Sequence, residues 1–180
     1  NAYEKHGHWK DCAVMLKGEA VWSFTLTFLK AWCYYIDTDY NFDNYRPSIY
    51  KIDKNIDDGF IQPFSDTPLD HEFVSESVYL NMINGATRSL YICTPYFIID
   101  NEIITALTLA SKRGVDVRII TPHIADKWYV HIVTQSYYPQ LIKAGIKIYE
   151  YTPGFIHAKT FVVDEEIATI GTINLDFRSL

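Results

Sequence analysis

Apolar residues in the second half of the chain recur with two alternating periods, one typical of helices and one typical of buried strands. Spacings of three and four residues predict helices, whereas short apolar runs bounded by Gly, Pro or Asp predict strands. Asp100 can cap one helix, and Gly114 and Gly145 lie where two helices are expected to end. The expected helices are 72–84, 101–113 and 127–144, the last one broken or restarted at Pro139, and the expected strands are 90–94, 115–121, 147–151, 158–163 and 167–170. This alternation predicts an α/β fold, in which a mixed β-sheet is flanked by helices on both faces.

The first third of the chain is less regular. A short strand at 14–16 is expected to lead into a helix at 19–35, with Trp22, Leu26, Leu29 and Cys33 along one face. Residues 37–59 are rich in Asp, Asn and Tyr and predict a surface excursion, followed by a short strand at 60–64. The most apolar stretch, 20–36, is interrupted by Ser, Thr and Lys, and a membrane span needs about 20 mostly apolar residues. We therefore expect a buried helix there, within one domain over residues 1–180.

Composition narrows the classes of protein to which the chain can belong. Its length of 180 residues and its hydrophobic content of 48% are typical of a folded domain rather than of a disordered chain. The formal net charge of −6 disfavours a general binder of nucleic acid or anionic lipid, although a local basic pocket can still hold a phosphate. Three widely spaced cysteines fit neither a disulfide framework nor a zinc cluster, so we expect reduced thiols in a cytosol-facing protein. The first ten residues are polar and are not a signal peptide, and we expect the chain to be a piece of a longer protein.

Candidate chemistry is concentrated near the C-terminus. His157 and Lys159 are two residues apart, so on a strand their side chains project from the same face, and Asp164 ends that strand. After the return strand, Gly171 allows close approach of a backbone group, while Thr172 and Asn174 add neutral hydrogen-bonding groups. One end of a hairpin would then gather the groups that phosphoryl chemistry without a metal needs. Lys159 and Asn174 can orient phosphate oxygens, and His157 can attack phosphorus or protonate a leaving alkoxide.

The alternative is a surface strand whose histidine and lysine only keep it soluble. A single His-x-Lys is compatible with that interpretation, and His8-Trp9-Lys10 is such a pair, with Met15 where an aspartate would complete the pattern. We interpret His8 as structural or incidental. The pattern around His157 specifies five residues, and it should arise by chance in fewer than about one in 10⁴ chains of this length.

This arrangement resembles the phospholipase D superfamily, whose signature is H-x-K-x4-D-x6-G-x-x-N. His157, Lys159, Asp164, Gly171 and Asn174 match the signature without a gap. Further segments look like the C-terminal half of bacterial cardiolipin synthases, namely 91–97, 114–120, 136–139, 144–151 and 174–180. The resemblance implies a phospholipase D-type lobe that carries the second of two motifs.

The resemblance also implies a reaction. Enzymes of this superfamily use two motifs that face each other, or one motif in a homodimer, so the partner of this chain would be a missing N-terminal catalytic lobe or a second copy. One histidine forms a phosphohistidine and the other acts as acid and then base. For His157 the acid/base role is favoured and the nucleophile role is the alternative, while Asp164 would orient or support a catalytic histidine. The implied reaction transfers a phosphatidyl group between phosphatidylglycerol molecules and releases glycerol, with no cofactor and no metal.

Other functions stay open at this stage. The chain can belong to another phosphodiesterase of the superfamily, such as a nuclease or a phosphatidylserine synthase, although its acidity counts against a nuclease and no nucleic-acid partner is expected. It can also be a lobe that is inactive alone and binds phospholipid headgroups. For the parent protein the resemblance implies the cytoplasmic face of the cell membrane, reached through transmembrane helices that lie outside this chain.

Two weaker signals point to metals. Residues 37–43 resemble a calcium loop, but Phe42 stands where the sharp turn needs glycine, and Ser48 stands where the bidentate glutamate belongs. His123 and His131 lack the spacing of a zinc site and are read as partly buried surface residues, with one of them near the mouth of the pocket if the family geometry applies.

Overall fold

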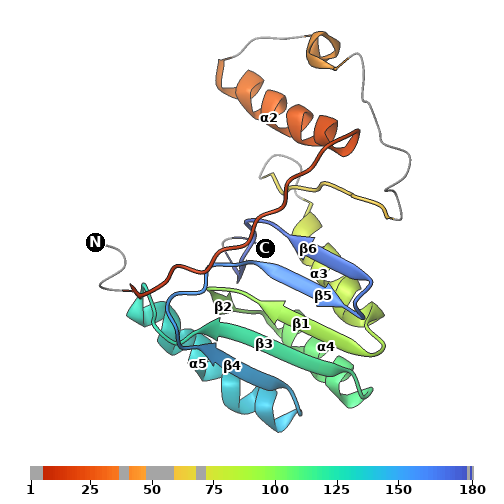
Figure 1. Cartoon of the computed structure of the whole chain (residues 1–180). Helices are drawn as coiled ribbons and strands as arrows, with labels where there is room; N and C mark the ends of the chain where they lie inside the picture. The colour runs from red at the N-terminus through yellow and green to blue at the C-terminus, as the bar shows by residue number, and fades with distance from the viewer. Residues whose placement is uncertain (1–5, 37–40, 48–58, 68–71, 178, 180) are drawn as a thin grey trace. The chain divides into compact units, whose positions relative to one another are not determined.

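The computed structural model describes residues 6–36, 41–47, 59–67, 72–177 and 179 (Figure 1). The chain falls into two compact units. Unit 1 contains residues 1–13 and 68–180, and unit 2 contains residues 14–67. The expectation of one domain over residues 1–180 stays a prediction. The first residues of the chain belong to the same unit as its C-terminal half.

Unit 1 is built on a five-stranded mixed sheet with the strand order β4-β3-β1-β5-β6. In this sheet β1, β3 and β4 are parallel, whereas β5 runs antiparallel to both β1 and β6. A second sheet pairs two short strands, β2 and β7, which are too brief for the sequence pattern to predict. The strands are β1 (Ser89–Cys93), β2 (Phe97–Ile98), β3 (Asp116–Pro122), β4 (Lys147–Tyr151), β5 (Thr160–Val163), β6 (Ile167–Ile170) and β7 (Leu175–Asp176). β5 begins two residues later than expected.

Three helices of unit 1, α3 (Val74–Gly85), α4 (Asn101–Lys112) and α5 (Trp128–Lys143), lie on one face of this sheet (Figure 1). The connections β1-α4-β3 and β3-α5-β4 step along the sheet in the same direction, so right-handed crossovers place both helices on the same side. α3 packs against α4. The α/β class and the mixed sheet are therefore confirmed. We also expected helices on the second face of the sheet. The helices of unit 1 do not cover that face, where side chains such as Tyr91 and Cys93 are half-buried.

The core of unit 1 lies between the sheet and these helices. Alternate residues of the central strands are buried against the helices, as the period of two requires. The ring of Tyr79 on α3 stacks on the ring of Phe161 on β5, with centroids 4.3 Å apart. Fully buried members of this core are Ile83, Leu90, Ile92, Ile103, Leu107, Val117, Ile119 and Leu141. The core thus fixes β1 and β5 side by side, and β5 follows directly after His157 and Lys159.

The helix boundaries follow local chemistry with one exception. Asp100 caps α4 as predicted, accepting a hydrogen bond of 2.8 Å from the backbone N–H of Ile103. Pro139, however, does not break α5, which continues through it to Lys143. Proline removes one helical hydrogen bond, here the one that the carbonyl of Gln135 would accept, and both residues are exposed, so water can satisfy that carbonyl.

Unit 2 contains the helix α2 (Ala20–Ile36) and a short 3₁₀ helix, η1 (Phe42–Tyr45). The predicted inner face of α2 is confirmed, since Leu29 is buried while Trp22, Leu26 and Cys33 are half-buried. The expectation of a buried helix is wrong, because Leu29 is the one buried residue described in α2. The strands expected at 14–16 and 60–64 are wrong, because neither segment pairs with another among the described residues. Of the excursion expected at 37–59, residues 37–40 and 48–58 lie outside the described part. No helix in the described ranges has the length and apolar character needed to cross a membrane.

Candidate functional site

The candidate site forms where the first residues of unit 1 lie along the segment that precedes β5. Gly7 forms a β-bridge with Gly154, and Lys10 forms one with Ile156. The backbone N–H of Lys10 donates to the carbonyl of Phe155 over 2.8 Å, and the N–H of His157 donates to the carbonyl of Lys10 over 2.7 Å. Position 154 must be glycine, because a Cβ there would collide with the backbone of His8. This pairing carries Asp11 to His157.

Two polar contacts hold the imidazole of His157. Its Nδ1 lies 3.2 Å from Oδ2 of Asp11, and its Nε2 lies 2.8 Å from Nζ of Lys159. The tautomer that satisfies both contacts carries its hydrogen on Nδ1, which donates to the carboxylate, and leaves the lone pair of Nε2 toward the ammonium. The predicted meeting of His157 and Lys159 is thus present, although both residues precede β5 rather than lying within it.

Aromatic rings flank the same imidazole. The ring of Trp9 lies 5.5 Å from that of His157, and the ring of Phe155 lies 5.9 Å from it, as measured between centroids. Trp9 and Phe155 also contact each other, with centroids 4.5 Å apart. Packing on these rings limits the rotation of the imidazole, so that its two nitrogens stay aligned with Asp11 and Lys159.

Charge in this cluster is set by burial and by the neighbours. Lys159 is only 8% exposed, and burial lowers the pKa of its ammonium, against the opposing effect of Asp11. Partial burial raises the pKa of Asp11, but the hydrogen bonds from His157 and from the backbone N–H of Cys12 outweigh it, so this pKa is lowered. Asp11 is therefore a carboxylate near neutral pH, and it faces a histidine and a lysine.

The cluster opens into a cleft of about 400 Å³. Its walls combine residues of the matched motif with residues from the start of the chain. Gly171 donates its backbone N–H to the carbonyl of Lys159 over 3.3 Å, which brings the segment after β6 to the cleft. The lining residues are Asp11, Cys12, Ala13, His157, Lys159, Gly171 and Thr172. Four of the residues expected from the sequence, His157, Lys159, Gly171 and Thr172, therefore meet in one place.

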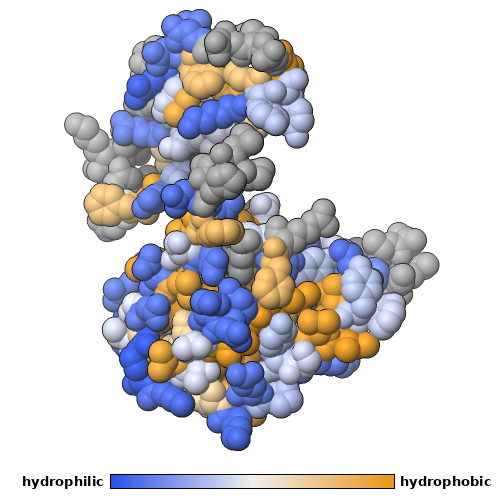
Figure 2. Space-filling model, turned by 180° about the vertical axis from the view of Figure 1, so that it is seen from behind, coloured by the Kyte–Doolittle hydropathy of each residue, from blue (hydrophilic) through white to orange (hydrophobic). Residues whose placement is uncertain are grey.

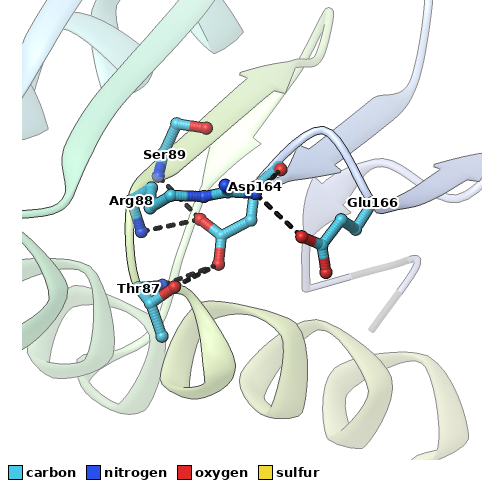
Figure 3. A network of polar contacts seen from close by, with 5 residues as sticks. All are labelled: Thr87, Arg88, Ser89, Asp164 and Glu166. Atoms are coloured by element: carbon cyan, nitrogen blue, oxygen red, sulfur yellow. Dashed lines mark hydrogen bonds and ion pairs between the residues drawn. The ribbon is translucent and has the colours of Figure 1, made fainter.

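Asp164 lies elsewhere, at the start of β1 (Figure 3). One carboxylate oxygen accepts from the backbone N–H groups of Arg88 and Ser89, each over 2.7 Å, and the other accepts from the N–H and hydroxyl of Thr87. The hydrogen bond from the N–H of Ser89 has the largest effect on the pKa of Asp164, and that from the hydroxyl of Thr87 has the next largest. Both hold this pKa well below its usual range. His157 and Asp164 are separated by the length of β5, at about 3.3 Å per residue. Within this chain, then, Asp164 does not contact His157, and the carboxylate that does is that of Asp11.

Asn174 also lies outside the lining of the cleft. Its side-chain N–H donates to the hydroxyl of Ser179 over 3.3 Å, while its buried Oδ1 has no hydrogen-bond partner among the described residues. The following residue, Leu175, begins β7 and donates its N–H to Oγ1 of Thr94. The structure therefore shows Asn174 at a strand start, and a contact with phosphate stays a prediction.

Sequence reasoning missed Asp11 and Trp9, which lie in the segment that was set aside because its second His-x-Lys is incomplete. The useful signal in His8-Trp9-Lys10-Asp11 was the aromatic residue and the carboxylate, and no local pattern joins them to His157. Of the histidines read as surface residues, His123 pairs through Nδ1 with Oε2 of Glu150 over 2.8 Å. In the calcium-like loop, Asn41 accepts from the N–H of Asp43 as a cap of η1, and Asp37 and Asp39 lie outside the described residues.

Taken together, the cluster can perform proton transfer or nucleophilic attack at Nε2 of His157. Asp11 stabilises the imidazolium that forms when Nε2 takes a proton or a phosphoryl group. The ammonium of Lys159, which contacts Nε2 here, is placed to move onto a phosphate oxygen that enters between them. The cleft thus combines a base, a cation and an orienting carboxylate.

The chain is similar in sequence to one described protein family and to several curated proteins. Residues 79–180 match the family described as "Cardiolipin synthase, PLD-like domain". A cardiolipin synthase of Alkalihalophilus pseudofirmus is 41% identical over 174 residues, which cover 96% of this chain and 34% of that protein. An uncharacterized protein of Streptococcus mutans is 50% identical over 181 residues, covering 100% of this chain and 38% of that one. The chain therefore spans about a third of the length of the curated relatives that it matches.

Among solved structures, the chain is similar to Nuc, a phospholipase D family member from Salmonella typhimurium. The two are 25% identical with a TM-score of 0.47, and the match covers 58% of this chain and 66% of that one. NucT from Helicobacter pylori matches with 20% identity and the same TM-score, over 59% of this chain and 70% of that one.

Proposed function

Because the chain belongs to the family of phospholipase D-like domains of cardiolipin synthases, we propose that its cleft is one half of a phosphatidyl-transfer site. The observation that carries the proposal is the double contact of His157, with Asp11 on Nδ1 and Lys159 on Nε2. The other half is a second histidine motif, supplied by a longer parent protein or by a second copy of the chain. The matched segment of about a third of each relative leaves room for such a half in the parent.

The proposed reaction proceeds in two displacements. In the first, a histidine nitrogen attacks the phosphorus of phosphatidylglycerol, the P–O bond to the headgroup glycerol breaks, and the second histidine protonates the departing glycerol oxygen. In the second, a hydroxyl of another phosphatidylglycerol loses its proton to that second histidine and attacks the phosphohistidine. The P–N bond breaks, and cardiolipin leaves. If water attacked the phosphohistidine in place of the lipid acceptor, the product would be that of hydrolysis.

For His157 we favour the acid/base role, with the nucleophile role as the alternative. In either role Nε2 is the reacting atom, and Asp11 holds the proton on Nδ1. Lys159, together with Thr172 and the motif residue Asn174, is proposed to bind the non-bridging phosphate oxygens. Burial of Lys159 removes competing water from its ammonium, which strengthens its attraction for a developing negative charge.

The test uses a parent protein with both motifs, phosphatidylglycerol vesicles and EDTA, with cardiolipin and glycerol as the measured products. Wild type should convert the lipid, and His157→Ala should lower the rate by about 10²- to 10⁴-fold, the usual contribution of acid/base catalysis. His8→Ala, in the incomplete His-x-Lys, is the matched control and should keep the wild-type rate. Full activity of His157→Ala would refute the site. Turnover of a different phosphodiester only would keep the site and refute the substrate.

Asp11→Asn in the same parent tests the orienting carboxylate. The neutral amide is nearly the same size, but it cannot stabilise the imidazolium, so kcat should fall by about 10²-fold or more with a smaller change in KM. Equal changes in kcat and KM would indicate a merely structural role.

A further inference from the structure

The first two turns of α5 expose an apolar surface that no described residue of unit 1 covers. Four side chains form it, and we call it the α5 patch: Trp128 (74% exposed), Tyr129 (55%), Ile132 (57%) and Val133 (38%). The pairs 128/132 and 129/133 are each four residues apart, so all four lie along one side of the helix. The rings of Trp128 and Tyr129 touch edge to face, with centroids 5.9 Å apart. The opposite side of α5 is already packed in the core through Thr134 and Leu141.

The patch lies at the same edge of the sheet as the candidate site. α5 starts just after the carboxyl end of β3, and Lys159 precedes β5 at the carboxyl end of β1, to which β5 is antiparallel. Phe155 connects the two regions. It lines a small cavity with Lys127 and Val130 at the start of α5, and its ring lies 5.9 Å from that of His157. Figure 2 shows hydrophobic side chains gathered on the right, over the start of α5.

The chemistry of the α5 patch fits the interfacial zone of a phospholipid bilayer. Trp and Tyr have an apolar body and a polar group, and they prefer the depth of the lipid headgroups, while Ile and Val can enter the acyl boundary. Lys127 and His131 border the patch and can meet lipid phosphates, and Nζ of Lys127 is 4.9 Å from the ring of Tyr96. Asp126, the nearby acid, is engaged with the hydroxyl of Tyr96 over 2.6 Å.

We propose that the α5 patch docks this protein on the surface of a phospholipid bilayer, next to the cleft that holds His157. The biological purpose of this docking rests on the proposed function, since a lipid substrate has to pass from the bilayer into the cleft. The docking itself does not depend on catalysis. With a net charge of −6 the whole chain is repelled by anionic lipid, so the affinity comes from insertion of apolar side chains and not from long-range attraction.

The binding test uses the full 180-residue chain, sedimented with vesicles of phosphatidylcholine mixed with phosphatidylglycerol. Ile132→Lys should lower the bound fraction by about tenfold, the cost of losing one inserted apolar side chain. Ile142→Lys is the matched control, since Ile142 lies in the same helix and is also 57% exposed, and it should bind as wild type does. Binding should persist in high salt. Equal loss in both variants, binding abolished by salt, or no binding by wild type would overturn the proposal.

Tryptophan fluorescence provides a second readout. Lipids brominated on their acyl chains should quench the emission of the wild type, and Trp128→Phe should remove most of that quenching while the other three tryptophans remain. If the variants at 128 and 132 instead change the sedimentation of the chain without vesicles, the patch is a protein interface and the proposal fails.

The proposed function and the docking can fail separately. His157→Ala should bind vesicles as wild type does, because it leaves the α5 patch intact. If no phosphatidyl transfer is found in the parent but patch-dependent binding persists, the proposed function fails and the docking stands. If transfer is found but Ile132→Lys and Ile142→Lys bind equally, the docking fails and the proposed function stands.

Discussion

At the scale of single residues, the carboxylate that contacts His157 is not the aspartate of the matched motif. Asp164 accepts hydrogen bonds from the backbone of residues 87–89 and joins the turn after β5 to the start of β1. This turn has Asp164 and Glu165 at φ 55° and 62°, the left-handed conformation of a tight hairpin, which aspartate tolerates. Asp11 supplies the partner of His157 instead. Within this chain the motif aspartate therefore joins two strands, while a carboxylate from outside the motif contacts the histidine.

The lowered pKa of Asp164 predicts a pH dependence of stability. A carboxyl group whose folded pKa is depressed stabilises the fold above its unfolded pKa of about 3.9, and this stabilisation is lost as the pH falls through the folded value. Asp164→Asn should thus unfold several degrees below wild type near neutral pH, and the gap should close in acid. Thermal unfolding at a series of pH values measures it. Glu165→Gln, in the same turn, is the control, and a gap that stays constant with pH would contradict the prediction.

At the scale of elements, α4 shows how the sheet acquires its helical layer. The helix begins at the cap Asp100, and it buries Ile103, Ala106, Leu107 and Ala110 at the spacing of one helical face. Leu107 is fully buried, whereas Leu109, two residues on, is 49% exposed. α4 also contacts α3 and β3, so its inner face links one helix to the sheet.

This contrast within one helix predicts the energetics of the core. Leu107→Ala leaves a cavity between α4 and the sheet and should lower the free energy of unfolding by about 2–5 kcal/mol. Leu109→Ala makes the same change of residue type in the same helix, so helix propensity changes equally in both variants. It should change the free energy of unfolding by about 0.5 kcal/mol or less. Urea unfolding of the full chain gives both values. Similar losses at the two positions would mean that the inner face of α4 is assigned incorrectly.

At the scale of the whole molecule, the chain carries only one complete His-x-Lys motif, while its first residues complete the surroundings of that motif. The sheet of unit 1 has helices on one face, and on the other Arg118 lies over the ring of Tyr91 at 5.1 Å. In the proposed reaction one histidine attacks phosphorus while another protonates the leaving oxygen, and a single histidine cannot do both at once. The phosphatidyl transfer that we propose therefore calls for a second motif.

We accordingly expect the 180-residue chain, when monomeric, to convert phosphatidylglycerol at least about 10²-fold more slowly than the parent with both motifs, which is the contribution of the missing acid or base. Product formation per mole of chain, with the oligomeric state from analytical ultracentrifugation, measures this. Activity that rises with self-association would identify a second copy as the partner. A monomer as active as the parent would show that one motif suffices.

Part of this structure follows from local sequence alone. The hydrophobic periodicity, with Gly, Pro and Asp at the ends of elements, predicted β4, β6, α4 and the α/β class, since these depend on neighbours within a few residues. The spacing of His157 and Lys159 predicted their contact for the same reason. Only the tertiary structure decided that Asp11, 146 residues before His157 in the sequence, is its partner, and that Asp164 binds the backbone at the start of β1. It also decided that the helices of unit 1 share one face of the sheet. Such contacts join residues that are far apart in the sequence. They depend on the strand order and on packing over the whole chain, so no local pattern of side chains can predict them.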